Sequence, residues 1–191
     1  MNQASGGHIF LHRPRGIQIK EIDGVLHITR KWFSLMFIFL LIFTVLWNSI
    51  FIYYIFIDSP RGTGENPTKI MPFFQFALGL ALLYYNITGL LNKTTITLSS
   101  TSLSVKHSPL PWPGKMKIAR SEIEQLFVEK NIRKTKSSVI ILFDLNIITK
   151  TDSRIRLLKN LSDKDQALYI ENILEDKLNI KDRVVPEEVD K

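Results

Sequence analysis

The sequence of 191 residues predicts a membrane α+β protein, in which a two-helix transmembrane hairpin is inserted into a cytoplasmic antiparallel β-domain. Three observations predict this fold class. Two long segments carry neither a charged residue nor a histidine, much of the remaining chain alternates apolar and polar residues, and the last alternating stretch is followed by a helical period. We expect the β-domain to close into a barrel or sandwich, because short strands with one apolar face need protected edges, and we expect a C-terminal amphipathic helix to cap it.

The two uncharged segments span residues 32–57 and 70–92. A helix rises about 1.5 Å per residue and the hydrocarbon core of a bilayer is about 30 Å thick, so both segments are long enough to cross it. Trp32 at one end of the first segment, with Tyr53 and Tyr54 near the other, is typical of the aromatic belts at membrane surfaces. The alternative is a pair of buried helices in a soluble core. The short connection at 58–69 is rich in glycine and proline, which predicts an antiparallel hairpin.

Basic residues are distributed unequally around these segments. Five Lys and Arg lie within residues 13–31, two in the connection 58–69, and five within residues 93–120. Because basic residues are enriched on the cytoplasmic side of membrane proteins, we expect both termini to be cytoplasmic and the connection to lie outside.

Polar and small residues within the two segments are candidates for helix packing. Asn48, Gln75 and Asn86 can form hydrogen bonds between helices, and Ala77 with Ala81 has the spacing that allows close approach. Neither segment carries an ionisable group at depth, which disfavours a transporter or a proton relay.

The polar part of the chain predicts strands and one helix. Residues 17–31 alternate around Asp23-Gly24, a strong hairpin signal, and follow an N-terminal tail at 1–16 that we expect to be flexible. The region 93–160 is expected to form the main β-domain, with a repeat of the same alternation at 96–105 and further strands at 116–119, 123–129, 138–149 and 154–158, about eight strands in all.

A helical period begins near Ser162 and defines a C-terminal helix at 161–180, before a tail at 181–191. Ser162, followed by Asp163, is suited to a helix N-terminus, where side-chain oxygens meet free amides. The apolar face is formed by Ala167, Ile170, Leu174 and Leu178, and Glu171, Glu175 and Asp176 are expected to lie mostly outside it.

Three stretches of the sequence resemble the pleckstrin-homology (PH) superfold, and more specifically bacterial PH-like proteins with a membrane helical hairpin: the Asp23-Gly24 hairpin leading into Arg30-Lys31-Trp32, the segment Pro109 to Gly114, and the terminal run from Ala167 to Arg183. The resemblance implies a PH-like barrel interrupted by the hairpin and a place in the bacterial inner (plasma) membrane. It implies no chemistry. The Pro109 to Gly114 segment is expected to be a rigid loop with Trp112 against the core or the headgroups, the alternative being a polyproline recognition ligand.

Signals for chemistry are weak throughout the sequence. The chain has no cysteine, which excludes disulfides and thiolate chemistry, and it contains no phosphate-binding glycine loop or metalloprotease motif. His8 and His12 are four residues apart, but the glycines before them and the proline after them argue against a metal site. Glu129 and Asp144 are conceivable as paired carboxylates, yet strand alternation predicts that both face solvent. We therefore predict no catalytic residue, no metal, no cofactor and no enzyme activity.

The basic segment 130–136 is the clearest candidate contact site. Lys130, Arg133, Lys134 and Lys136 lie there between two predicted strands, in what we expect to be a loop. Residues 93–160 carry 13 Lys and Arg against 5 Asp and Glu, whereas 161–191 carry 5 against 9, so charge is segregated along the chain. Such a segment can be an ordinary solvated face, a contact for anionic lipid, or a site for a defined partner. Nucleic acid is disfavoured, because stacking aromatics are not interleaved with the cations.

Two functional hypotheses follow. The first is a nonenzymatic integral membrane protein whose cytoplasmic domain is an interaction, scaffold or accessory-subunit module for a protein partner or a homo-oligomer. The second is a module that senses anionic lipid through Lys130, Arg133, Lys134 and Lys136. An enzyme whose site is completed by another subunit is left open.

Overall fold

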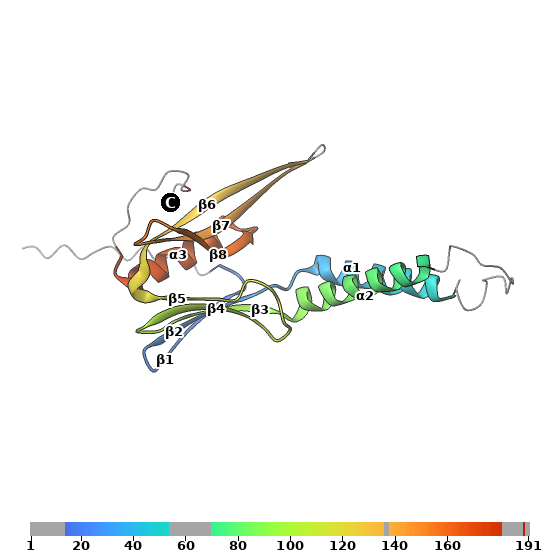
Figure 1. The fold of residues 1–191 in the computed structure, drawn as a ribbon, viewed down its shortest axis with the longest axis horizontal. Coiled ribbons are helices and arrows are strands. Elements are labelled where there is room, and N and C mark those ends of the chain that lie inside the picture. The colour runs from blue at the N-terminus through green and yellow to red at the C-terminus, as the bar shows by residue number, and fades with distance from the viewer. Residues whose placement is uncertain (1–13, 54–69, 136–137, 181–188, 190–191) are drawn as a thin grey trace, which may run out of the picture. The chain divides into compact units, whose positions relative to one another are not determined.

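The computed structural model describes residues 14–53, 70–135, 138–180 and 189, and it is an α+β fold with two long apolar helices and antiparallel sheets (Figure 1). The chain divides into two compact units. The first comprises the ranges Met1–Arg30, Thr95–Lys106 and Gly114–Lys191, and the second comprises Lys31–Thr94 and His107–Pro113.

The first five strands form one antiparallel sheet in chain order. These strands are β1 (Ile17–Ile22), β2 (Val25–Lys31), β3 (Lys93–Leu98), β4 (Ser102–Ser108) and β5 (Met116–Ala119). The strands β2 and β3 are neighbours, although the whole helical hairpin lies between them in the sequence. The expected insertion of the hairpin into the β-domain is therefore confirmed.

The last three strands form a second antiparallel sheet in the order β6 (Ile123–Thr135), β7 (Ser138–Thr149) and β8 (Arg154–Leu161). A 3-10 turn, η3 (Arg120–Glu122), connects β5 to β6. Within the described residues neither sheet closes on itself, so of the expected barrel or sandwich the barrel is wrong: the eight strands are divided between a sheet of five and a sheet of three. Alternation predicts which strands have an apolar face. A sheet closes into a barrel only if its first and last strands also pair with each other, and alternation does not predict that pairing.

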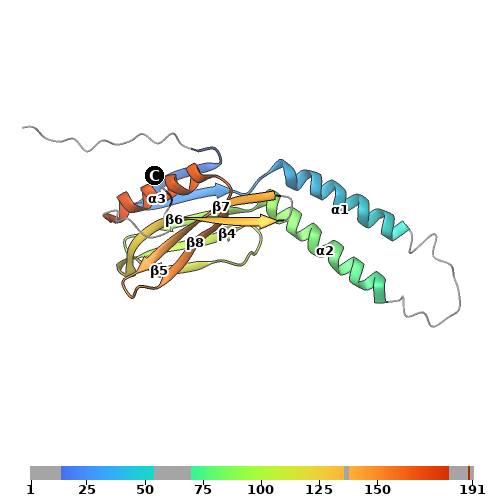
Figure 2. The ribbon, with the colours of Figure 1, turned by 90° about the horizontal axis from the view of Figure 1, so that it is seen from above.

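The core of the first unit is formed by the apolar faces of both sheets and by the helix α3 (Lys164–Leu178), which packs on β6, β7 and β8 (Figure 2). Its fully buried side chains include one from each of β2, β3, β4, β6, β7, β8 and α3: Ile28, Ile96, Leu103, Leu126, Leu145, Leu161 and Ile170. The alternation expected for β1 and β2 is confirmed, since Ile17, Leu26 and Ile28 are all buried.

Helix α3 begins and ends with side-chain and backbone caps. The Asp163 side chain accepts a hydrogen bond from the amide of Asp165, and Asn179 ends the helix in the left-handed conformation with φ of 56°. Glu171 and Glu175 are buried, so the expectation that they lie mostly outside the apolar face is wrong, whereas Asp176 is exposed as expected.

One arginine connects the first hairpin to α3. Arg30 donates from Nε to Oε1 of Gln166 over 3.0 Å, and Gln166 in turn donates to the carbonyl of Arg15. Burial lowers the pKa of the Arg30 guanidinium, and the charge of Asp163 opposes that shift. Because an arginine titrates far above neutral pH, Arg30 remains charged and holds β2 against the helix.

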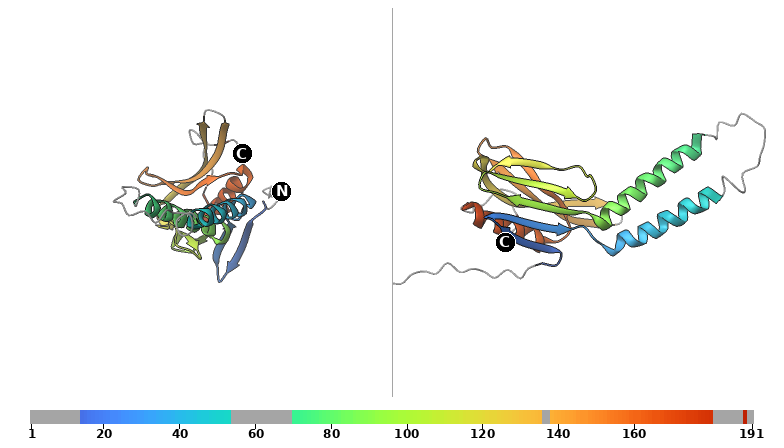
Figure 3. Two further views of the ribbon diagram at one scale, coloured as in Figure 1. Left: turned by 90° about the vertical axis from the view of Figure 1, so that its right-hand side faces the viewer. Right: turned by 90° about the horizontal axis from the view of Figure 1, so that it is seen from below.

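The second unit contains the helical pair α1 (Leu35–Tyr53) and α2 (Ile70–Leu91), which run antiparallel (Figure 3). By length and composition, the ranges Leu35–Tyr53 and Phe74–Leu91 are long and apolar enough to cross a membrane. The expected connection at 58–69 lies outside the described residues, as do most of the two predicted tails. Within the second tail, Val189 donates its amide to the carbonyl of Val128 over 2.9 Å.

Candidate functional site

The ends of β6 and β7 form a two-stranded extension, which we call the arm and define as residues 130–135 and 138–142 (Figure 1). Strand β8 pairs with β7 only as far as Phe143, opposite Leu161. Beyond that point β7 pairs with β6 alone, from Leu142 opposite Asn131 to Ser138 opposite Thr135. Within the part of the chain that the structure describes, the outer edge of β7 is therefore unpaired along the arm.

The basic segment lies on this arm. Lys130, Arg133 and Lys134 belong to β6 and are exposed, whereas Lys136 lies outside the described residues. The expectation of a loop at 130–136 is therefore wrong up to Thr135, because β6 continues through the basic residues as a regular strand. Consecutive residues of a strand point to opposite faces, so Arg133 and Lys134 lie on different faces of the arm.

Aliphatic side chains accompany the cations. Ile132 is 48% exposed, and on β7 Val139, Ile140 and Ile141 are 61%, 47% and 44% exposed. The arm thus combines a cationic strand with an aliphatic one, and Ile140 lies directly opposite Arg133. These aliphatic residues were not among the contact residues predicted from the sequence. The signal was the unbroken apolar run from Val139 to Phe143, since a strand with one solvent face normally alternates.

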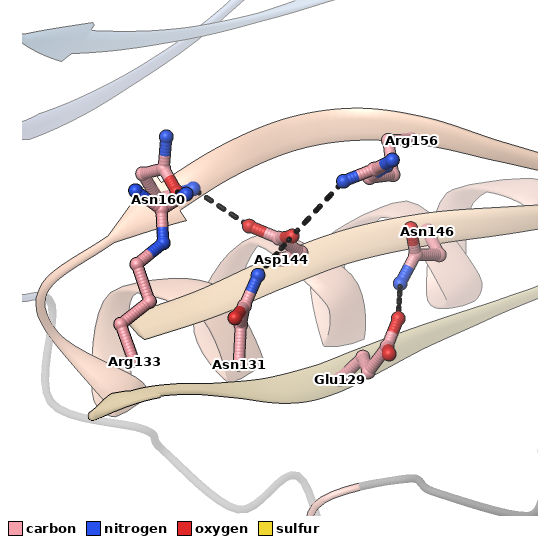
Figure 4. Close-up of polar contacts among 7 residues, drawn as sticks. All are labelled: Glu129, Asn131, Arg133, Asp144, Asn146, Arg156 and Asn160. Atoms are coloured by element: carbon pink, nitrogen blue, oxygen red, sulfur yellow. Dashed lines mark hydrogen bonds and ion pairs between the residues drawn. The ribbon is translucent and has the colours of Figure 1, made fainter. Parts of the chain in front are cut away.

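A polar network lies at the base of the arm (Figure 4). The Asp144 carboxylate accepts a hydrogen bond from the backbone amide of Asn160 over 2.7 Å and forms an ion pair with Arg156 at 3.8 Å. Arg133, on the arm, donates to Oδ1 of Asn160 over 2.9 Å. Asn160 has a φ of 55° at the end of β8, where the pairing of β7 with β8 shifts register. The network therefore fixes the place where the arm leaves the sheet.

The two carboxylates considered as a possible pair lie within this network. Glu129 and Asp144 are cross-strand partners, and Glu129 accepts a hydrogen bond from Asn146 over 3.0 Å. Asp144 is only 3% exposed, so the expectation that it faces solvent is wrong. Alternation correctly predicted that the Asp144 side chain lies on the face of β7 away from the core. On that face, however, Asn160 and Arg156 contact Asp144. Amide and guanidinium donors hold both carboxylates, which is the arrangement of a structural network.

An aromatic cluster lies in the second unit, next to the helix ends. Trp32 contacts the rings of His107 and Trp112 edge-on, with ring centroids 5.3 and 5.6 Å apart, and Trp112 also contacts Tyr85. Trp32 donates from Nε1 to Oγ1 of Thr94 over 2.7 Å, and the same oxygen lies 3.0 Å from Nδ1 of His107. Since Thr94 accepts from Trp32, its hydroxyl proton is available to His107.

The loop that carries Trp112 is held by an asparagine at the end of α2. Asn92 donates from Nδ2 to the carbonyl of Leu110 over 3.0 Å and accepts from the Leu110 amide at Oδ1 over 2.9 Å. Its own carbonyl accepts from the amide of Trp32. The loop is therefore bonded to α2, since Asn92 and Tyr84 donate to its Leu110 and Pro111 carbonyls. Its Trp112 ring contacts two further aromatic rings.

Polar and glycine residues lie at the contact between α1 and α2, together with Phe37, whose ring contacts that of Tyr85 edge-on. Asn86 is fully buried and donates from Nδ2 to Oγ1 of Thr44 over 3.0 Å, and a side chain at Gly79 would collide with Asn48. A side chain at Gly89 would collide with the ring of Phe37 in the same way.

The structure places the residues proposed for helix packing differently from one another. Asn86 bonds across the helix pair, and Asn48 faces Gly79. Gln75 is half-buried, and Ala77 and Ala81 are exposed, so the close approach is made by glycines instead.

No group of three or more His, Cys, Asp or Glu that could hold a metal ion occurs within the described ranges. His8 and His12 lie outside them. His27 is half-buried, and its Nδ1 lies 3.2 Å from Oγ1 of Thr97.

Comparison with known proteins finds no matching family model and no matching curated protein. The observations above therefore define a class by architecture alone: an α+β protein with an apolar helical hairpin between two neighbouring strands. The PH-like resemblance remains an expectation from the sequence.

Proposed function

We propose that this chain is an integral membrane protein, anchored by α1 and α2, whose β-domain is a nonenzymatic interaction or scaffold module. The observation that carries the proposal is the exposure of the helical pair. Only 6% of the best apolar window in α1 and 22% of that in α2 are buried, whereas the core helix of a soluble protein is mostly buried. Large apolar side chains such as Met36 and Phe39 are 76% and 72% exposed, and they need an apolar environment.

The aromatic cluster supports the same proposal. Trp32 and Trp112 are amphipathic rings at the ends of the helices, which is where membrane proteins place such rings. Lys31 and Lys93 flank the helical pair on that side, and both are exposed. With the basic residues around them, they favour a cytoplasmic β-domain, and the inner membrane of a bacterium is the setting that the PH-like resemblance suggests.

The absence of cysteine allows a direct test of insertion and orientation. Thr63→Cys places a thiol in the connection between the helices, and Ser100→Cys places one in the exposed β3–β4 turn. In intact cells an impermeant maleimide should label the first variant only, and the second should react after lysis. Both variants should stay in the membrane fraction after alkaline extraction. Extraction of the protein would refute anchoring, and the reverse labelling would refute the orientation.

An interaction module should have a stoichiometric partner or form a defined homo-oligomer. Purification in mild detergent, followed by light scattering with the detergent contribution subtracted, measures the mass of the particle. A mass above that of one chain supports the proposal, and a strictly monomeric particle without a partner contradicts it.

A further inference from the structure

We propose that the arm binds the surface of an anionic lipid bilayer, with Lys130, Arg133 and Lys134 at lipid phosphates and the aliphatic residues of β7 at the boundary between headgroups and acyl chains. This inference rests on the proposed function, because the hairpin of α1 and α2 keeps the domain beside a membrane. The arm is then one contact surface of the proposed module, and its partner is the lipid.

Charge is the first argument. From Lys130 to Phe143 the sequence contains no Asp or Glu, so no acidic side chain of the arm offsets its cations. Asp144, at the base, is buried and bound by Asn160 and Arg156. Each cation near an anionic membrane surface strengthens attachment roughly fivefold.

The aliphatic residues are the second argument. An ordinary solvated strand has no reason to expose Val139, Ile140 and Ile141 together. They lie on both faces of β7, which exposes apolar surface around that strand, and β6 carries the cations beside it. Cations next to exposed aliphatic groups are the combination by which peripheral segments bind acidic membranes.

The backbone limits the depth of insertion. Along the described part of the arm the outer edge of β7 has no strand partner, and unpaired amides and carbonyls are costly in hydrocarbon. Water remains available among the headgroups, so the arm lies in that layer while the aliphatic side chains reach below it.

Two other occupants fit the arm less well. A second copy pairing edge to edge along β7 would bring two cationic arms together, and like charges oppose that contact. An extended protein strand would satisfy the edge of β7 but would leave the cations of β6 without a role. Of these three occupants, the anionic lipid surface is the one that uses both strands of the arm.

The test uses the full chain with a single cysteine, Ile140→Cys, labelled with an environment-sensitive fluorophore. The labelled protein is reconstituted into vesicles of phosphatidylcholine alone or with phosphatidylglycerol, each with and without a quencher on the acyl chains. The expected result is a blue-shifted emission and strong quenching only with phosphatidylglycerol, both reduced by high salt. Ser100→Cys with the same label is the reference and should stay accessible to water in both kinds of vesicle.

A charge-matched pair of variants distinguishes the effect of the cations in the arm from the effect of the overall charge of the chain. In the labelled background, K130Q/R133Q/K134Q should weaken the binding of the arm to the phosphatidylglycerol-containing surface about a hundredfold, because each of the three cations contributes roughly fivefold. K115Q/K117Q/K150Q removes three exposed cations elsewhere and should retain the blue shift.

Equal emission in the two kinds of vesicle, or an equal loss in the two triple variants, would overturn the proposal. A blue shift in detergent that grows with protein concentration would overturn it in favour of a second copy. Flotation of the chain with the vesicles after an alkaline wash reports anchoring separately, so a failure of the arm is distinguishable from a failure of the proposed function.

Discussion

The Asp144 carboxylate on β7 accepts a hydrogen bond of 2.7 Å from the backbone amide of Asn160 on β8. This bond joins the two strands at the place where their regular pairing ends, and Arg133 of the arm binds the side chain of the same asparagine. One buried carboxylate thus fixes both the end of the three-stranded sheet and the start of the arm.

Replacing Asp144 should destabilise the domain. Asp144→Ala removes the charged acceptor of a part-buried hydrogen bond from the Asn160 amide, and we expect a loss of about 1–3 kcal/mol in the free energy of unfolding. Asp144→Asn keeps an acceptor oxygen and should lose less. Chemical denaturation in mild detergent measures both, with the exposed Asp176→Ala as a control. Equal stability of Asp144→Ala and the control would contradict the structural role of this carboxylate.

Asn160 should be sensitive to its backbone conformation as well as to its side chain. Its φ of 55° is easy for glycine and strained for alanine. Asn160→Gly and Asn160→Ala both remove the acceptor for Arg133, so the difference between them isolates the backbone. We expect Asn160→Ala to be less stable than Asn160→Gly by about 1–2 kcal/mol in denaturant unfolding. If alanine were the more stable of the two, the left-handed conformation would be wrong.

Thr94 should be essential to the aromatic cluster. Thr94→Val preserves the shape of the side chain but leaves Trp32 Nε1 without an acceptor and removes the hydroxyl beside His107. We expect a loss of about 1–3 kcal/mol in the free energy of unfolding, with recovery in Thr94→Ser. Thr95→Val, on the opposite face of β3, is the matched control. A thermal midpoint that falls equally in the two valine variants would show that the hydroxyl of Thr94 contributes nothing specific.

Gly79 should tolerate no large side chain. Gly79→Leu would drive its side chain into Asn48 and separate α1 from α2, at a cost of about 1–3 kcal/mol for overpacking. Ala77→Leu adds comparable volume at an exposed position of the same helix and should leave the thermal midpoint in detergent nearly unchanged. The reverse order of the two midpoints would indicate that the contact follows the alanines, as the sequence pattern suggested.

Local sequence patterns predicted the elements of the fold well. The strand bounds expected at 116–119 and 138–149 agree with β5 and β7, and the number of strands agrees across the described residues. Composition located α1 and α2, since long uncharged apolar segments are typical of such helices. Alternation placed Leu26 and Ile28 in the core and Asp144 on the opposite face.

The properties of the candidate site were harder to predict, because they depend on residues far apart in the sequence. Strand alternation gives two faces but does not say what covers each, so Asp144 was expected in solvent although Asn160 and Arg156 enclose it. The basic residues looked like a loop because cations and Asn131 are poor strand formers, and only their pairing with Val139 to Leu142 makes β6 continue through them. Small-residue spacing suggested Ala77 and Ala81, but the rotation of α2 against α1 selects Gly79 and Gly89.

The sequence by itself determined where the chain is apolar enough to cross a membrane, which segments are strands, and that its cations are concentrated before residue 160. These properties are local, since composition and periodicity over a few turns or strands are enough to produce them. Tertiary structure alone decided that β2 and β3 pair across the inserted hairpin, that the sheets stay open, and that the basic segment stands beside exposed aliphatic residues on an arm. Each of these depends on hydrogen bonds and packing between distant segments, for which no local pattern carries the information.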